Sequence, residues 1–339
     1  GYPGGMTSAE RCQAAWAGRP TDRLSVQPIC MSFAARDAGV PFRRYAEDTL
    51  VLARCQARVA EVYGFDIVSL TSDPCREAHD LGQAILWFND DPPMPDPGRP
   101  LLREYGDLSS LTLSDPSVGR MGAAVAGIRA LREMQERPIL GWVEGPIAEA
   151  ADIRGLSQII EDLLDEPDWV DELFAFLVTL ALRYAEEQVR AGAAMIGIGD
   201  AAASLIGPDL YRKHIFPAES RLVKGIQALG VPVRLHVCGN TTHLLEDFAR
   251  LGVEMVDIDS VADLTLAKRA FGDSAAILGN LDPVRDFRDG TPKGIRRGLA
   301  ECHAIVGQRH ILGAGCEFPA DTPPENVRAL HEYAPLSAS

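Results

Sequence analysis

The chain has 339 residues, 46% of them hydrophobic and 24% charged, which are the proportions of a globular protein with a sizeable core. Its 48 acidic and 33 basic residues give a formal net charge of −15, which argues against nucleic acid or an anionic membrane as a partner because both would repel it. No run approaches the roughly 18 apolar residues of a membrane span, no secretory signal pattern stands at the start, and the 7 cysteines lack a disulfide framework, so a cytoplasmic protein is expected.

The first third of the chain begins as an alternation of helices and strands and then departs from it. Residues 7–20 are predicted to form an N-terminal helical segment, with hydroxyl and acidic residues at its start and Pro20 at its end. Three predicted elements follow: a strand over 24–31, a helix over 48–63 and a strand over 65–70. Residues 71–118 then form an insertion, because their proline-rich part, residues 89–98, excludes a regular element.

From residue 119 the alternation is regular. Helices are predicted over 119–136, 155–165, 168–191, 208–229, 242–251, 261–271, 290–307 and 324–333, and strands over 138–143, 195–199, 233–237, 254–259, 275–279 and 310–313. Eight short apolar strands in total, each followed by helix, indicate a single (β/α)8 TIM barrel over residues 1–339 with an insertion after strand two. An open doubly wound sheet is the competing fold, but the Gly-x-Gly-x-x-Gly fingerprint typical of it does not follow the first strand.

Candidate metal ligands stand at the ends of two predicted strands. His236 and Cys238 are two residues apart on a strand, so their side chains point to the same face. Cys316 follows the eighth strand, and in a barrel all three would lie on the rim where the strands end. Two thiols and one imidazole with an open fourth position are the ligands of a catalytic zinc site. Two buried cysteines and a core histidine are the alternative.

Several motifs resemble the uroporphyrinogen decarboxylase superfamily, and specifically its corrinoid-dependent methyltransferase branch, typified by methylcobalamin:coenzyme M methyltransferases. They are residues 236–240 (His-Val-Cys-Gly-Asn), 279–283 (Gly-Asn-Leu-Asp-Pro), 315–319 (Gly-Cys-Glu-Phe-Pro) and 322–326 (Thr-Pro-Pro-Glu-Asn), with Gly145-Pro146 and Gly199-Asp200. The resemblance runs from Thr7 to the C-terminus. The decarboxylases carry an arginine-rich stretch after the first strand, whereas here Arg36 is the only cation of residues 30–38, too little for an octa-anionic porphyrinogen.

The resemblance implies a zinc ion held by His236, Cys238 and Cys316, and a thiol that takes a methyl group from methylcobalamin. The chain has no Asp-x-His-x-x-Gly signature for binding cobalamin, so a partner corrinoid protein is expected to present the methylcobalamin. A small-molecule methyl donor or thiol acceptor completes the reaction. Three alternatives remain: a tetrapyrrole decarboxylase, a demethylating O-, N- or S-methyltransferase that loads the corrinoid protein, and a non-catalytic zinc-stabilised scaffold.

Four further residues are candidates for the site. Asp259, preferred over Asp257, is predicted as a fourth ligand when no thiol is bound, and water is the alternative. Asp200 is predicted to orient substrate, although both aspartates could instead cap helices. Asn240 and Asn280, beside glycines at strand ends, are predicted to support the bound cofactor by hydrogen bonds. The insertion at residues 89–98 is expected to border the docking surface of the corrinoid protein.

Overall fold

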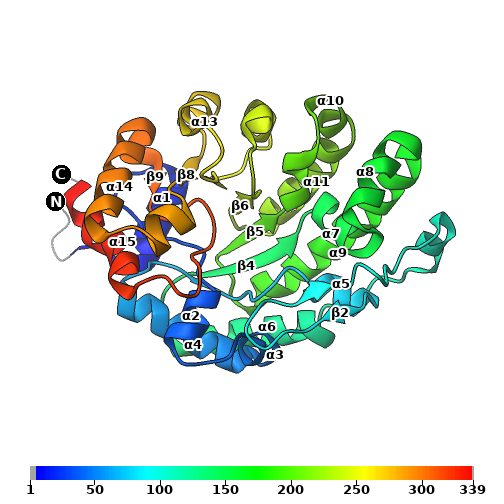
Figure 1. Cartoon of the computed structure of the whole chain (residues 1–339), viewed down its shortest axis with the longest axis horizontal. Coiled ribbons are helices and arrows are strands. Elements are labelled where there is room, and N and C mark those ends of the chain that lie inside the picture. The colour runs from blue at the N-terminus through cyan, green and yellow to red at the C-terminus, as the bar shows by residue number, and fades with distance from the viewer. Residues whose placement is uncertain (1–4, 338–339) are drawn as a thin grey trace.

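The computed structural model describes residues 5–337 and shows a curled parallel sheet with helices around it (Figure 1). Seven strands follow one another in the order β1-β4-β5-β6-β7-β8-β9. The eighth place is filled by Val26, which forms a parallel bridge with Leu312 next to β9 and accepts a hydrogen bond of 2.8 Å from the amide of Asp66 next to β1. This closes the ring, so the predicted barrel is confirmed. The ends of the predicted 1–339 domain, residues 1–4 and 338–339, lie outside the described residues.

The barrel strands are short, and their ends are in register. Their bounds are β1 (Val68–Ser69), β4 (Ile139–Glu144), β5 (Met195–Gly199), β6 (Val233–His236), β7 (Met255–Asp257), β8 (Ala276–Leu278) and β9 (His310–Ile311). One row of paired residues at their carboxyl ends consists of Glu144, Gly199, His236 and Asp257. Side chains of one row point to the same side of the sheet, so this row sets which groups meet at the rim.

The helices begin and end largely at the residues that favour helix ends. For example, Asp48 caps the N-terminus of α4 by accepting from the amides of Leu50 and Val51, and Gly64 ends α4 with a φ of 74°. The helices are α1 (Ser8–Ala17), α2 (Ser32–Asp37), α3 (Phe42–Glu47), α4 (Thr49–Tyr63), α5 (Arg76–Leu81), α6 (Gly119–Met134), α7 (Pro146–Arg154), α8 (Leu156–Asp165), α9 (Pro167–Ala191), α10 (Pro208–Leu210), α11 (Phe216–Gln227), α12 (Leu245–Ala249), α13 (Leu264–Phe271), α14 (Pro292–Val306) and α15 (Pro324–Ser337).

The main differences between the structure and the predicted elements lie in the first predicted strand, in three additional helices and in the helix predicted over 208–229. The strand predicted over 24–31 is reduced to the single bridge at Val26. Helices α2, α3 and α7 were not predicted, because no long loop separates them from a neighbouring predicted element: α2 starts directly after residue 31, one residue separates α3 from α4, and one separates β4 from α7. The helix predicted over 208–229 is interrupted by a π turn, η3 (Tyr211–Ile215), since Pro217 has no amide hydrogen to continue the α-helical pattern.

Helix α1 fills the N-terminal end of the barrel. Cys12 and Trp16 belong to one buried cluster with residues on or beside the barrel strands, namely Ile67, Leu140, Met195, Met255, Ala276, Leu278 and Ile311. The indole of Trp16 also donates a hydrogen bond of 3.0 Å to Gln27. Because side chains fill this end of the barrel, open space remains at the opposite end, where the strands finish.

The insertion contains little regular structure besides α5. Its antiparallel hairpin joins β2 (Ile85–Leu86) to β3 (Met94–Pro95), and a 3-10 turn, η1 (Tyr105–Ser110), follows. Prolines 95, 97 and 100 of this segment line the cavity described below. The insertion therefore forms part of the cavity wall.

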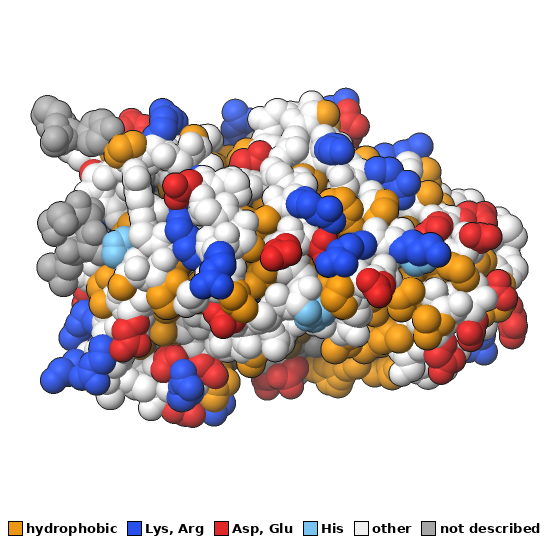
Figure 2. Space-filling model, turned by 90° about the horizontal axis from the view of Figure 1, so that it is seen from above, with side chains coloured by type: hydrophobic (Ala, Val, Ile, Leu, Met, Phe, Trp, Pro, Cys, Tyr) orange, Lys and Arg blue, Asp and Glu red, His pale blue; other side chains and the backbone are white. Residues whose placement is uncertain are grey.

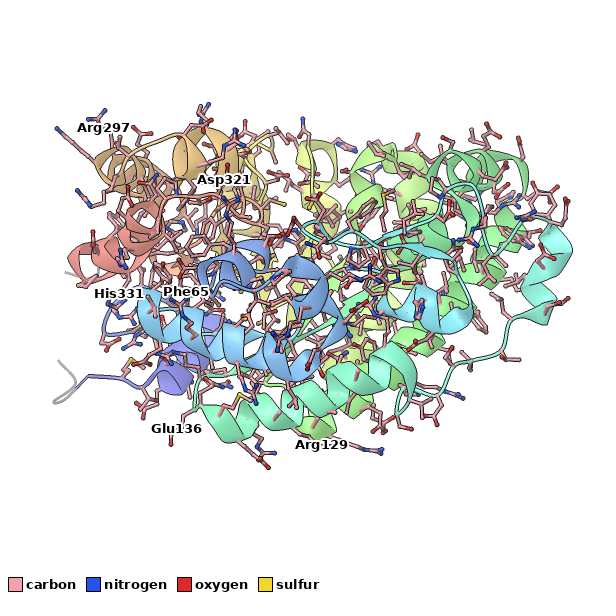
Figure 3. The ribbon with its side chains drawn as sticks, turned by 60° about the horizontal axis from the view of Figure 1, so that its bottom comes forward. Phe65, Arg129, Glu136, Arg297, Asp321 and His331 are labelled. Atoms are coloured by element: carbon pink, nitrogen blue, oxygen red, sulfur yellow. The ribbon has the colours of Figure 1, made fainter. Side chains whose placement is uncertain are left out.

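Charged side chains of both signs cover the outside. On the face shown in Figure 2, acidic and basic side chains are intermingled, and Arg129, Glu136 and Arg297 point outward from the helical layer in Figure 3. In the described part of the chain, no helix combines the length and apolar character that crossing a membrane requires.

Candidate active site

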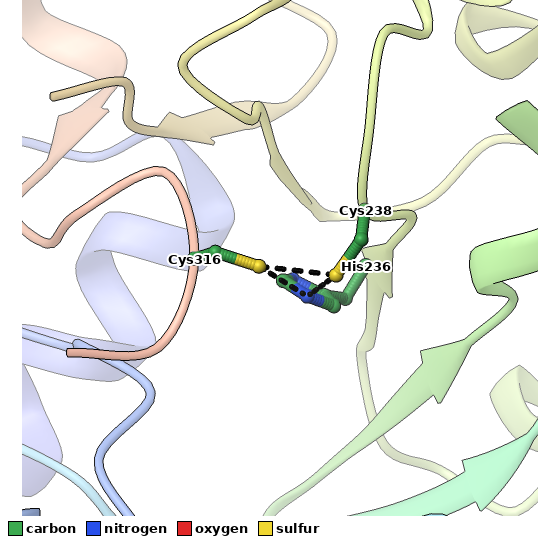
Figure 4. Close-up of side chains that lie close together, drawn as sticks. All are labelled: His236, Cys238 and Cys316. Carbon is green, nitrogen blue, oxygen red and sulfur yellow. Dashed lines mark hydrogen bonds between the residues drawn. The ribbon is translucent and has the colours of Figure 1, made fainter. Parts of the chain in front are cut away.

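Three side chains with metal-binding atoms converge at the carboxyl ends of the strands (Figure 4). His236 ends β6, Cys238 follows it, and Cys316 comes from the loop after β9. The His236 Nε2 atom lies 3.1 Å from the Cys238 sulfur and 3.6 Å from the Cys316 sulfur, and the two sulfurs are 3.0 Å apart. The structure thus brings together the three residues that the sequence suggested, although Cys316 is 78 residues from Cys238.

A buried ion pair fixes the imidazole. Asp257, opposite His236 in the neighbouring strand, contacts Nδ1 at 2.9 Å. Arg234, fully buried, holds Asp257 with contacts of 2.9 and 3.0 Å. Burial alone would lower the pKa of His236. The hydrogen bonds to Asp257 and Cys316, together with the charges of these two residues, outweigh burial and raise the pKa of His236 to about 10. The imidazole orientation is therefore set, with Nε2 facing the sulfurs.

Cys238 and Cys316 differ from the other cysteines in their exposure. Both are partly exposed, whereas Cys12, Cys30, Cys55, Cys75 and Cys302 are buried. The hydrogen bond with Cys238 and then burial raise the pKa of the Cys316 thiol. The thiols that can meet a ligand are thus the two beside His236.

A cavity of about 650 Å³ opens beside these three residues. Its wall is largely apolar and includes Trp142, whose ring meets the His236 ring edge-on with centroids 6.1 Å apart. Arg76 is the one lysine or arginine among its described lining residues. The acidic lining residues are Asp73, Glu77, Asp96, Glu144, Asp152 and Glu317. The cavity can hold a small molecule in contact with His236 and both thiols.

The structure does not bring the predicted Asp259 to the three ligand atoms. Its carboxylate accepts hydrogen bonds from the amides of Gly239 (2.8 Å) and Ser260 (2.6 Å). Asp259 thereby holds the loop that carries Cys238. The group of metal-type atoms among the described residues contains His236, Cys238 and Cys316 without Asp259, so its role as a fourth ligand stays a prediction.

The other predicted residues also lie away from the cavity wall. Asp200 is fully buried and accepts a hydrogen bond of 2.8 Å from the amide of Ala148 in α7, and burial raises its pKa to about 6. Asn280 donates to the carbonyls of Asp259 (3.2 Å) and Ala262 (3.0 Å). Asn240 is exposed and accepts from the amide of Thr242 at 3.1 Å. The functional roles of these three residues stay predictions.

A second acidic group, here called the carboxylate cluster, was missed in the sequence. It consists of Glu144 at the end of β4 and of Glu149 and Asp152 on α7, with oxygen atoms within 4.8 Å of one another. Burial is the largest cause that raises the pKa of each of the three. Nearby Glu77 accepts from the amide of Glu144 at 2.6 Å, and burial raises its pKa to about 7. The available signal was the i, i+3 spacing of two acids directly after a strand that ends in a third.

The fold and the rim residues define a (β/α)8 barrel with a candidate site at its strand ends. The family model of uroporphyrinogen decarboxylase (URO-D) matches residues 7–335, and the chain belongs to this family.

Relatives with described activities agree with the predicted branch. The chain is 29% identical over 340 residues to the methylcobamide:CoM methyltransferase MtbA of Methanosarcina mazei, with 97% of each chain covered. It is 27% identical over 336 residues to a methylated-thiol–coenzyme M methyltransferase of the same organism, with 96% of this chain and 88% of the relative covered. A solved methyltransferase from Methanosarcina mazei superposes with a TM-score of 0.88 at 23% identity, covering 97% and 98% of the two chains, which supports the fold.

Proposed function

We propose that this protein is a zinc-dependent methyltransferase that moves a methyl group between a corrinoid protein and a small molecule, for which a thiol acceptor is the first candidate. The observation that carries the proposal is the convergence of His236, Cys238 and Cys316 on one side of a cavity. The relative named methylcobamide:CoM methyltransferase supports corrinoid-linked chemistry.

The three residues fit a zinc ion by the chemistry of their donor atoms. Two sulfurs and one imidazole nitrogen are ligands that zinc prefers, and a carboxylate behind the imidazole is the usual support of such a ligand. Here Asp257 provides that support through Nδ1 and leaves Nε2 for the metal. When bound, zinc lowers the pKa of a coordinated thiol, so that the thiol is a thiolate near neutral pH.

In the proposed reaction the substrate thiol loses its proton and its sulfur forms a bond to the methyl carbon of methylcobalamin. The cobalt–carbon bond breaks with its electron pair remaining on cobalt, so a methyl thioether and cob(I)alamin are the products. The protein residues contribute binding and orientation rather than proton transfer. The apolar wall around Trp142 keeps water from the sulfur, and the insertion at Pro95 and Pro97 borders the space through which a corrinoid protein must reach.

The decarboxylase alternative is disfavoured by the charge of the cavity. A porphyrinogen with many carboxylates needs several cations, but Arg76 is the one arginine among the described lining residues, and no lysine accompanies it. Glu77, Glu144 and Asp152 on the same wall would repel such a substrate.

The test combines metal analysis with a spectroscopic assay. We expect about one zinc per chain and, with methylcobalamin, a corrinoid partner and a thiol, conversion of the methylcobalamin spectrum to that of cob(I)alamin. Removing the metal with a chelator should stop the conversion, and zinc should restore it. A metal-free protein that remains fully active would contradict the proposal. Running the assay backward, from cob(I)alamin and a methylated small molecule, decides the direction of transfer.

A further inference from the structure

We propose that the carboxylate cluster is a subsite for a cation, and that this cation is the ammonium end of the small-molecule substrate. This inference rests on the proposed function and adds the substrate class: a small molecule with a positive charge at one end and the methyl-accepting or methyl-donating atom at the other. Glu144 and Asp152, with the buried Glu149 beside them, bind the positive end, and the reacting end lies at His236, Cys238 and Cys316.

The cluster is built by a strand end and one helical face. Glu144 is the last residue of β4, and α7 starts at Pro146 and turns Glu149 and Asp152 toward it. Glu149 is only 2% exposed, and neither of its carboxylate oxygens has a hydrogen-bond partner. The Oδ2 atom of Asp152 is also buried without a partner. Buried carboxylate oxygens normally have partners, and a ligand that donates hydrogen bonds would supply them here.

Protein cations do not supply the missing charge. Arg120 is bound to Asp73 at 2.6 Å. Arg76 donates to Ser72 and to the carbonyl of Arg120, each at 3.0 Å. Within the described residues, no lysine or arginine forms an ion pair with Glu144, Glu149 or Asp152. The raised pKa values of these three groups express the same imbalance, which a bound cation would relieve.

The register of the barrel connects the cluster to the three metal-type ligands. Glu144 is paired with Gly199, and Gly199 is paired with His236. Two strand spacings place Glu144 and His236 about 10 Å apart at their Cα atoms, with both side chains on one side of the sheet. The residue between them is glycine, lines the cavity, and has no side chain to divide it. Gly199 lies close to the Glu144 carboxylate, since a Cβ atom added at Gly199 would be 3.4 Å from Glu144 Oε1. One small molecule can therefore lie over Gly199 and reach both ends.

An organic ammonium fits this space better than a bare metal ion. The cavity is continuous from Glu144 and Asp152 to Cys238 and Cys316, and its volume of about 650 Å³ far exceeds what a metal ion needs. Trp142 and Tyr184 line it with aromatic rings, which favour organic cations. Glu144 and Asp152 line the cavity and can accept hydrogen bonds from a primary ammonium group, and Glu149, with an oxygen within 4.8 Å of theirs, adds a third carboxylate behind them.

The test compares matched thiols with the zinc-loaded protein and methylcobalamin. The acceptors are 2-aminoethanethiol, 3-aminopropanethiol, 2-mercaptoethanol and 2-mercaptoethanesulfonate, which differ in length or in terminal charge. An ammonium group also lowers the pKa of its own thiol, so the deciding quantity is the ratio of kcat/KM for the amino thiol to that for 2-mercaptoethanol, compared between proteins. We expect Glu149→Gln and Asp152→Asn each to reduce this ratio at least 10-fold, and the exposed control Glu161→Gln to leave it unchanged.

The outcomes separate the inference from the proposed function. A ratio unchanged in both cluster variants, or a preference for the sulfonate thiol, overturns the inference while methyl transfer stands. Absence of turnover with all thiols counts against the proposed function, and the subsite is then decided by thermal shift. Ethylammonium that raises the Tm of the wild type but not of Glu149→Gln supports the subsite. A rise produced by Mg²⁺ or Ca²⁺ alone, and lost in Glu149→Gln, overturns the ammonium assignment in favour of a metal ion.

Discussion

The two sides of the cavity hold their functional groups in opposite ways. On the β6 and β9 side, His236 is fixed by Asp257, and Asp257 is itself paired with Arg234. On the β4 and α7 side, the oxygens of Glu149 are buried with none. Soft sulfur and nitrogen donors with a prepared support suit a tightly held zinc ion, whereas unpartnered carboxylates suit a cation that comes and goes. The difference separates a site for a resident cofactor from one for a substrate.

The largest expected effect comes from removing one thiol of the zinc side. Cys316→Ala should lose the bound zinc and reduce methyl transfer by at least about 10³-fold, because the substrate thiol then has no metal to ionise it. The fold should be little changed, since Cys316 lies on the loop after β9 and is partly exposed. Zinc content, the cobalamin assay and thermal melting check this. The control is Cys55→Ala in α4, which should keep both zinc and activity; equal loss in the two variants would show a structural effect.

Breaking the support behind the imidazole should have the next largest effect. Asp257→Asn should weaken zinc binding about 10- to 100-fold, because the imidazole loses its charged partner. It should also lower the free energy of unfolding by about 3 kcal/mol, because Arg234 remains buried without a counter-ion. Competition with a chromophoric zinc chelator measures the affinity, and urea unfolding measures the stability. Asp259→Asn is the matched comparison, and equal zinc affinity in Asp257→Asn and the wild type would refute the supporting role.

The stability that Glu77 contributes beside the carboxylate cluster should fall as the pH rises, which is opposite in sign to the effect of an acid whose pKa is lowered by folding. Burial raises the pKa of Glu77 from 4.5 to about 7 despite the amide of Glu144, with Asp73 raising and Arg76 lowering it. The folded protein holds this proton more tightly than the unfolded chain, so the stabilisation is full below pH 4.5 and is lost as the pH rises through about 7.

Glu77→Gln should remove that loss. We expect the decrease in the free energy of unfolding between pH 5 and pH 8 to be smaller in the variant than in the wild type by about 1–3 kcal/mol. Urea unfolding at the two pH values measures it, with Glu161→Gln as the control. A variant that follows the wild type at both pH values would show that Glu77 is not the titrating group.

The smallest effect is expected at Asn240. Its side chain is exposed and accepts one hydrogen bond from Thr242, so Asn240→Ala should change stability by less than about 0.5 kcal/mol and zinc affinity less than about twofold. A larger loss of zinc affinity would restore Asn240 to the group of residues that support the cofactor.

The three proposed zinc ligands could be predicted from the sequence better than the carboxylate cluster could, for physical reasons. His236 and Cys238 are fixed by the two-residue period of a strand, and Cys316 follows from the rule that barrel strands end at one rim. The alternation of strands and helices likewise predicted the barrel. The roles of the acids were harder to assign, because Asp257 and Asp259 are equivalent in pattern, and only the three-dimensional structure shows that Asp257 contacts His236 and Asp259 contacts backbone amides.

The carboxylate cluster required a helix that the sequence pattern did not reveal. Helix α7 starts one residue after Gly145, so no loop marked its beginning. Without that helix, Glu149 and Asp152 read as residues of a polar connection between strand and helix. Their burial without partners depends on how α7 packs on the barrel, and local sequence does not determine that packing.

The central claim is that His236, Cys238 and Cys316 hold a zinc ion with one position open to a thiol, and X-ray absorption at the zinc edge tests it most directly. The account predicts two sulfur ligands at about 2.3 Å with one imidazole nitrogen and one light atom in the resting protein, and a third sulfur after a thiol acceptor is added. Cys316→Ala should lose this signal. A spectrum that shows no sulfur ligand, or one that does not change when the thiol is added, would contradict the account.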